Sequence, residues 1–134
     1  MTIKPQSQSG AKLIPLTFHK KDTPYLTKLA VSSHGKTEIL CVETISCLTA
    51  NGNYTTIHLN NNQKLTACIT LKRFQNKLDP KQFLRVHQGS LVNANYITAY
   101  MPNSNMLIIN NHMHIKVSRS NKIIIQQFIK QITP

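Results

Sequence analysis

Short apolar runs separated by turn-forming residues constrain the fold of this chain more than any other feature. His34-Gly35, Asn51-Gly52-Asn53 and Asn60 to Lys64 each lie between two such runs. Gly and Asn accept the positive φ angles of tight turns, so each pair of runs is expected to fold back as an antiparallel hairpin. The pattern predicts strands over residues 26–32, 37–42, 46–50 and 54–59, with another that begins near Leu65.

The second half of the chain continues this pattern. Residues 82–87 alternate between apolar and polar side chains, as a half-buried strand does. Three further short strands are predicted over residues 96–101, 106–109 and 114–117, separated by Pro102 to Asn105 and by Asn110-Asn111. A succession of short strands at intervals of roughly 8 to 12 residues is typical of a sandwich-like all-β domain.

Two short helices are expected beside these strands. Thr70 is a good N-cap for a helix that carries Leu71, Phe74 and Leu78 at helical spacing, and Asp79-Pro80 would end it. Residues 121–132 carry a second apolar stripe at helical spacing. Its members are Ile124, Ile125, Phe128, Ile129 and Ile132. The predicted fold class is therefore mostly β, with small antiparallel sheets and one or two short helices.

Length and charge suggest one domain behind a basic arm. With 134 residues, of which 40% are hydrophobic, the chain can build one core but not two ordinary ones. Residues 1–24 are rich in Ser, Gln, Pro and Lys and are expected to form a flexible arm, which leaves residues 25–134 as the domain. The arm holds four of the 16 basic residues and one of the four acids, so the domain retains a charge of about +9 out of +12.

This charge implies an acidic partner: DNA, RNA or an anionic membrane surface. No run approaches the ~18 apolar residues of a membrane span, and the N-terminus has no apolar signal segment, so a cytoplasmic protein is expected. Cys41, Cys47 and Cys68 form no C-x-x-C pair and are interpreted as small core residues. His112 and His114 have no acid or Cys nearby and are expected to face solvent on a strand, so no metal or other cofactor is predicted.

The segment from Phe83 to Ile97 carries the most suggestive group of donors. Arg85, His87 and Gln88 follow one another at a predicted strand end. In a strongly basic chain such a cluster indicates contact with nucleic acid, since phosphates attract cations and base edges accept these donors. The simpler interpretation is a half-buried strand with a polar outer face. Asn93 is interpreted as structural, with its side chain bonded to a turn or backbone group.

Several pieces of the chain occur in an order that resembles a known family. They are Val42 to Ile45, Asn51 to Leu59, Thr70 to Phe74, Phe83 to His87 with its F-x-R-x-H pattern, Leu91 to Asn93, and Ile115 to Ser120. In this order and spacing, from about residue 42 to residue 126, the chain resembles the LytTR family of bacterial DNA-binding domains. It departs from the family at Gly89 and Ser90, where many members carry a small hydroxyl residue and then an aromatic one.

The resemblance implies a sandwich-like arrangement of small sheets and a transcriptional regulator. Such a protein would bind double-stranded DNA by inserting loops and strand ends into successive major grooves. Because one small domain reads few base pairs, two copies are expected on repeated half-sites. No membrane and no small-molecule substrate are expected as partners. Asn53, Gln88 and Arg119 match family positions that face base edges. Lys72, Arg73, His87, Ser120, Asn121 and Lys122 would hold phosphates.

Other functions are weighed against this one. An RNA or single-strand binding module would need aromatic side chains for base stacking, and Tyr54, Tyr96 and Tyr100 are the candidates. A protein-binding adaptor would ignore nucleic acid altogether. Asn53 could also serve only as a turn former. An enzyme is not expected, because the four acids are scattered and no nucleophile, base and acid occur in a catalytic pattern.

Overall fold

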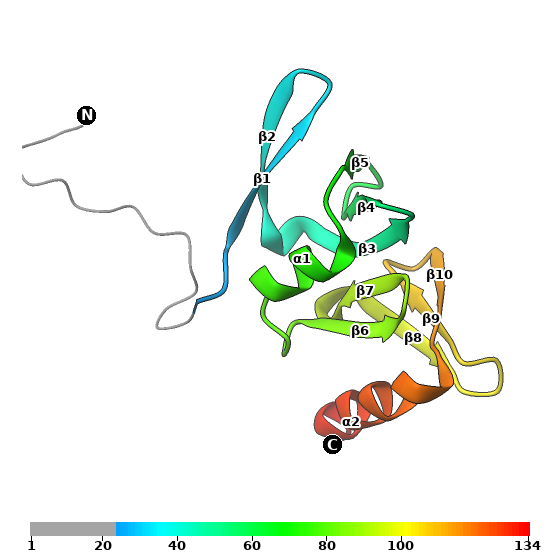
Figure 1. The fold of residues 1–134 in the computed structure, drawn as a ribbon. Helices are drawn as coiled ribbons and strands as arrows, with labels where there is room; N and C mark the ends of the chain where they lie inside the picture. Colours follow the sequence, from blue (N-terminus) through cyan, green and yellow to red (C-terminus); the bar gives the residue numbers. More distant parts are fainter. Residues whose placement is uncertain (1–23) are drawn as a thin grey trace, which may run out of the picture.

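The computed structural model describes residues 24–134, which form three antiparallel sheets and two α-helices (Figure 1). The central sheet has the strand order β5-β4-β3-β7-β6. Its strands are β3 (Ile45–Asn51), β4 (Tyr54–Leu59), β5 (Lys64–Ala67), β6 (Phe83–His87) and β7 (Ser90–Asn93). The mostly β fold predicted from the sequence is confirmed. The arm predicted over residues 1–24 lies outside the described residues, apart from Pro24.

Smaller elements flank the central sheet (Figure 1). They are the hairpin β1 (Lys28–Ser33) and β2 (Lys36–Cys41), the three-stranded sheet β8 (Ile97–Met101), β9 (Met106–Ile109) and β10 (Met113–Lys116), and the helices α1 (Leu71–Lys77) and α2 (Lys122–Ile132). Three single 3-10 turns connect them: η1 (Val42–Thr44), η2 (Ala94–Tyr96) and η3 (Arg119–Asn121). The sequence-based strand bounds agree with these to within two residues, and those of β4 and β9 are the same. Strand β7 was not revealed by the turn pattern.

The turns form where Gly and Asn were expected to allow them. His34 and Gly35 have φ angles of 52° and 76°, and Asn110 and Asn111 have 54° and 66°. Two successive positive φ angles give the two-residue turn at His34-Gly35 the twist that matches its strands, whereas the β9–β10 turn has three residues between its paired positions Ile109 and Met113. Gly52, at the tip of the β3–β4 hairpin, has φ 63°. Local turn chemistry therefore determines the strand pairing on both sides of the molecule.

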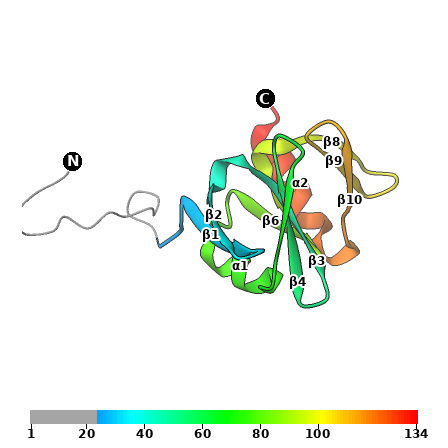
Figure 2. The ribbon, with the colours of Figure 1, turned by 90° about the horizontal axis from the view of Figure 1, so that it is seen from above.

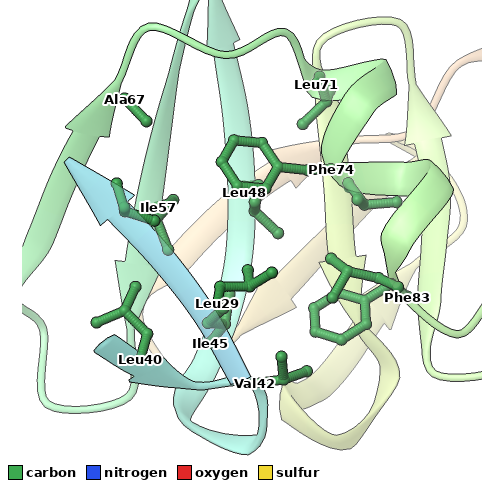
Figure 3. Packing of buried hydrophobic residues seen from close by; sticks show 13 residues of the cluster. Leu29, Leu40, Val42, Ile45, Leu48, Ile57, Ala67, Leu71, Phe74 and Phe83 are labelled. Atoms are coloured by element: carbon green, nitrogen blue, oxygen red, sulfur yellow. The ribbon is translucent and has the colours of Figure 1, made fainter. Parts of the chain in front are cut away.

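Two hydrophobic clusters cover the opposite faces of the central sheet. The first joins the sheet to the β1–β2 hairpin and α1, with Leu29, Leu48 and Phe74 among its buried members (Figure 3). The second joins it to β8–β10 and α2, through Val92, Leu107 and Ile125. Successive residues of a strand point to opposite faces, so Cys47 packs in the second cluster and Leu48 in the first. Both faces of β3 are therefore interior.

Both predicted helices are present. The Thr70 hydroxyl caps α1 by accepting a hydrogen bond from the Arg73 amide at 3.4 Å, and Leu71 and Phe74 are buried beneath the helix. In α2, Ile125 is buried, but Ile132 at the end of the predicted stripe is 64% exposed. The last turn of α2, which carries Ile132, therefore extends beyond the second cluster, against which Ile125 and Ile129 pack.

The interpretation of the three cysteines as core residues is wrong for two of them. Cys47 is buried, but Cys41 and Cys68 are exposed. Cys41 ends β2, paired with Lys28 on the outer face of a hairpin that has only one face to bury. The apolar character of the neighbouring residues did not distinguish the inner from the outer face.

Candidate nucleic-acid interface

A β-bulge shapes the end of β6. The register of β6 and β7 shifts between Arg85 and His87, so Val86 has no partner of its own on β7. Bulges often re-aim side chains beside functional sites. Here the carbonyl of Val86 accepts a hydrogen bond from the Ser118 amide at 2.8 Å. The bulge thereby anchors the segment that follows β10.

The turn between β6 and β7, which follows the bulge, is also bonded to strand β3. The Ala50 amide donates to the Gly89 carbonyl at 2.9 Å, next to the tip of the β3–β4 hairpin. Three loops therefore lie side by side along one edge of the molecule. They are the β3–β4 turn (Asn51–Tyr54), the β6–β7 turn (His87–Ser90) and the segment Ser118–Lys122, and we call them the three-loop edge.

Helix α1 borders this edge as well. The Thr55 hydroxyl donates to the Ile69 carbonyl at 2.6 Å, which places the start of α1 at the base of the β3–β4 hairpin. Figure 2 shows the tip of that hairpin at the same edge of the molecule as α1. Lys72 and Arg73, in the first turn of α1, are both exposed.

Each residue predicted to face base edges lies exposed on a different loop. Asn53 is in the β3–β4 turn, Gln88 in the β6–β7 turn and Arg119 in η3. Ser120 is exposed beside Arg119, and its hydroxyl lies 3.3 Å from that of Ser118. Asn121 and Lys122 are half-buried where α2 begins. The fold thus gathers residues from three distant parts of the sequence.

His87 lies half-buried at the base of the β6–β7 turn. Its Nδ1 accepts a hydrogen bond from the Gly89 amide at 3.0 Å. A ring nitrogen that accepts carries no proton, so in this geometry the proton of the imidazole is on Nε2. His87 can therefore donate one hydrogen bond from Nε2 while it supports the turn with Nδ1.

Arg85 has a role that the sequence did not reveal. The sequence predicts Arg85 as a donor available to nucleic acid, but its guanidinium is engaged by acceptors of the protein itself. It donates to the carbonyls of His87 and Gln88 and to the side chain of Gln75 on α1. Gln75 and Arg85 are ten residues apart on a helix and a strand, and no local pattern connects them.

The charges near the three-loop edge are one-sided. In the described range the acids are Glu38, Glu43 and Asp79, which lie on β2, in η1 and just after α1. Glu38 is paired with Lys36 at 3.2 Å. The three loops and the exposed start of α1 therefore carry basic and neutral residues only, an arrangement that attracts an anion.

Other kinds of site find little support within residues 24–134. They contain no group of three or more His, Cys, Asp or Glu side chains that could hold a metal ion. The two histidines considered for a metal, His112 in the β9–β10 turn and His114 on β10, are both exposed as expected. None of the helices in this range has the length and apolar character needed to cross a membrane.

Comparison with known proteins supplies independent information. A family model described as the LytTr DNA-binding domain matches residues 35–130. Among solved structures, a LytTr DNA-binding domain of a putative methyl-accepting/DNA response regulator from Bacillus cereus is similar with a TM-score of 0.67 and 21% sequence identity. The similarity covers 77% of this chain and 96% of that one, and at this identity it concerns the fold. No curated protein matches.

Proposed function

The chain belongs to the LytTR family of DNA-binding domains, and from this premise we propose that it is a transcriptional regulator that reads duplex DNA with its three-loop edge. The observation that carries the proposal is the pair of backbone hydrogen bonds, Ala50 to Gly89 and Ser118 to Val86. These bonds hold three loop tips at a constant spacing. A surface that is rigid before binding loses little entropy when it meets a rigid duplex.

The side chains at the loop tips have the chemistry needed to distinguish bases. An Asn or Gln amide can donate to and accept from the major-groove edge of adenine, and an Arg can donate twice to guanine. We assign these roles to Asn53, Gln88 and Arg119. Each such bidentate contact contributes about 1–3 kcal/mol of discrimination against the wrong base.

A second group of residues would hold the backbone of the DNA. It comprises Lys72, Arg73, His87, Ser120, Asn121 and Lys122, whose side chains carry N–H or O–H donors beside the loop tips. Contacts to phosphates position a protein on the duplex and provide affinity, but they carry no direct sequence information. Loss of any of these six should therefore weaken binding to all duplexes by a similar factor.

The test is a fluorescence-anisotropy titration with a duplex selected from a randomised library and with a scrambled duplex. Salt would be varied from about 50 to 200 mM, the range in which phosphate contacts change affinity steeply. We expect the selected duplex to bind more tightly. Arg119→Ala should reduce that preference by about 5- to 150-fold, the effect of about 1–3 kcal/mol. Lys130→Ala, which removes an exposed charge from the last turn of α2, is the control.

Equal binding of both duplexes by the wild type, with the same salt dependence, would overturn the proposal of sequence-specific recognition. The hypothesis of RNA or single-strand binding would then return, and titration with single-stranded oligonucleotides of the same sequences would test it. Fewer observations favour that hypothesis. The Tyr96 hydroxyl donates to the Glu43 carbonyl and the Tyr100 hydroxyl donates to Asn105, so of the three candidate tyrosines only Tyr54, at 52% exposed, is more than half open to stacking.

We also propose that two copies act together on repeated half-sites. One small domain reads few base pairs, and the many non-specific sites of a genome compete with any short target. Sedimentation of the protein with duplexes that carry one or two half-sites would show whether the second copy binds more tightly than the first. Binding that ignores nucleic acid in all these assays would instead favour the adaptor.

A further inference from the structure

The β6–β7 turn has an unusual backbone for a hairpin with two residues between its last paired positions. His87 pairs with Ser90, so Gln88 and Gly89 form the loop. Two-residue hairpin loops usually require a positive φ at one or both positions, because only that twist matches the strands. Neither Gln88 nor Gly89 is among the described residues with a positive φ. The conformation of this turn therefore does not follow from its own residues.

Side chains and neighbouring strands hold the turn instead. Arg85 donates from Nε to the His87 carbonyl at 3.0 Å and from Nη2 to the Gln88 carbonyl at 2.5 Å. The His87 ring accepts from the Gly89 amide, and the Ala50 amide donates to the Gly89 carbonyl. A backbone group of each residue from His87 to Gly89 thus takes part in a hydrogen bond that holds the turn.

The guanidinium of Arg85 also connects this turn to α1. Nη1 donates to the Gln75 side-chain oxygen at 2.6 Å. Three of the five N–H groups of Arg85 are engaged within the protein and its side chain is half-buried, so Arg85 has fewer donors left for a phosphate than a free arginine. Burial also lowers the pKa of the Arg85 guanidinium from its usual value, although an arginine of this kind stays charged at neutral pH.

We propose that Arg85 is a positioning residue that determines which base Gln88 can read. By holding the carbonyls of His87 and Gln88, it sets the direction in which the Gln88 side chain leaves the turn. Through Gln75 it keeps the turn at a constant distance from α1, where Lys72 and Arg73 lie. This inference rests on the proposed function, since it assigns a structural cause to the base preference of the same surface.

Arg85→Lys tests this role because lysine keeps the charge but has one compact ammonium in place of a planar fork. It cannot reach three acceptors in the geometry that Arg85 uses. We expect the preference for the selected duplex over a duplex altered only at the base read by the β6–β7 turn to fall by about 5- to 150-fold. The salt dependence of binding should stay unchanged, since the number of charges is the same.

A second variant and a control make the result specific. Gln75→Ala removes one of the three acceptors, so a smaller loss of preference in the same direction is expected. Lys130→Gln should leave the preference unchanged. If Arg85→Lys retains the full preference, or if it weakens the selected and altered duplexes by the same factor, Arg85 is a phosphate contact or a purely structural residue and the inference is overturned.

Amide exchange measured by NMR in the DNA-free protein separates this inference from the proposed function. In Arg85→Lys the amides of residues 87–90 should exchange faster, while those of the distant Asn60 to Asn62 turn stay as in the wild type. Unchanged exchange at residues 87–90 would overturn the positioning role even if DNA binding were altered. A wild type that prefers no duplex would overturn the proposed function, and the exchange result would still decide whether Arg85 holds the turn.

Discussion

Asn93 shows how one buried side chain connects distant strands. It is 0% exposed, its Nδ2 donates to the Ile45 carbonyl at 2.8 Å, and its Oδ1 accepts from the Asn95 amide at 3.0 Å. The interpretation of Asn93 as a structural residue is confirmed. It both ends β7 and caps η2, and it ties them to the first residue of β3.

Asn93→Ala should destabilise the fold by about 2–3 kcal/mol, because it leaves the buried Ile45 carbonyl and the part-buried Asn95 amide without their partner. Urea unfolding followed by circular dichroism would measure the change. Asn95→Ala, which alters an exposed side chain and keeps the backbone amide, is the matched control. A loss below about 0.5 kcal/mol, the usual range for surface substitutions, would contradict this expectation.

His58 makes stability depend on pH. The ring is half-buried on β4, with Nε2 3.0 Å from the Thr49 hydroxyl. Burial lowers the pKa of His58 from its ordinary value of 6.5, and the charges of Lys64 and His112 lower it further. The unfolded chain therefore binds a proton more readily than the folded one in the window below pH 6.5.

The contribution of His58 to stability is fully present above the unfolded pKa near 6.5 and is lost as the pH falls from there to the lowered folded pKa. We expect the urea midpoint to decrease between about pH 7 and pH 5, and His58→Gln to make that decrease shallower. Curves that stay parallel for the two proteins would show that other groups cause the pH dependence.

At the scale of elements, the β3–β4 hairpin tip connects stability with a proposed DNA contact. Gly52 has φ 63° at the tip of the β3–β4 hairpin, and a Cβ built on it meets no atom within 4 Å. The glycine is thus required by the backbone angle alone, with no steric contribution from its neighbours. Since Asn53 follows it directly, the tip conformation also determines where that candidate base contact lies.

Gly52→Ala should destabilise the protein by about 1–2 kcal/mol, the cost of holding an L-residue at a positive φ. Gly52→Asn should cost less, because Asn tolerates this region better. Thermal unfolding of both variants checks the order. Equal losses of stability in Gly52→Ala and Gly52→Asn would indicate that the turn changes its conformation on substitution. In that case Gly52→Ala should also show a reduced preference for the selected duplex.

At the scale of the whole molecule, the layers determine which thiols are accessible. Cys47 lies between the central sheet and β8–β10, 3.4 Å from the Met113 sulfur, and burial raises the pKa of its thiol to about 12. Cys41 and Cys68 lie on the outside. The thiolate is the reactive form, so a buried and protonated Cys47 should be inert.

A disulfide-exchange reagent should therefore modify two thiols quickly in the native protein and the third only on unfolding. Cys47→Ser should leave the number of fast-reacting thiols unchanged, whereas Cys41→Ser should remove one. Three equally fast thiols would mean that β8–β10 opens readily from the central sheet. The rate of the third thiol in increasing urea would measure the free energy of that opening.

The sequence alone determined the local features of this protein and its family. The hairpin turns at His34-Gly35 and Asn110-Asn111, the Thr70 cap and the helices after it depend on neighbours in the chain, whose conformational preferences are short-range. The family motifs are short and local as well, and they were sufficient to indicate a LytTR domain. Asn53, Gln88 and Arg119 were predicted as base contacts on the same resemblance, and they stay predictions until binding is measured.

Only the tertiary structure decided how distant residues meet. The bulge at Val86, the bond from Ser118 to it and the link from Arg85 to Gln75 join residues with no common local pattern. The same holds for the thiols, since Cys41 and Cys47 occur in similar apolar runs yet one is exposed and the other buried. Periodicity shows that a strand has two faces, but burial depends on which elements pack against each face, and that is settled by the packing of the whole chain.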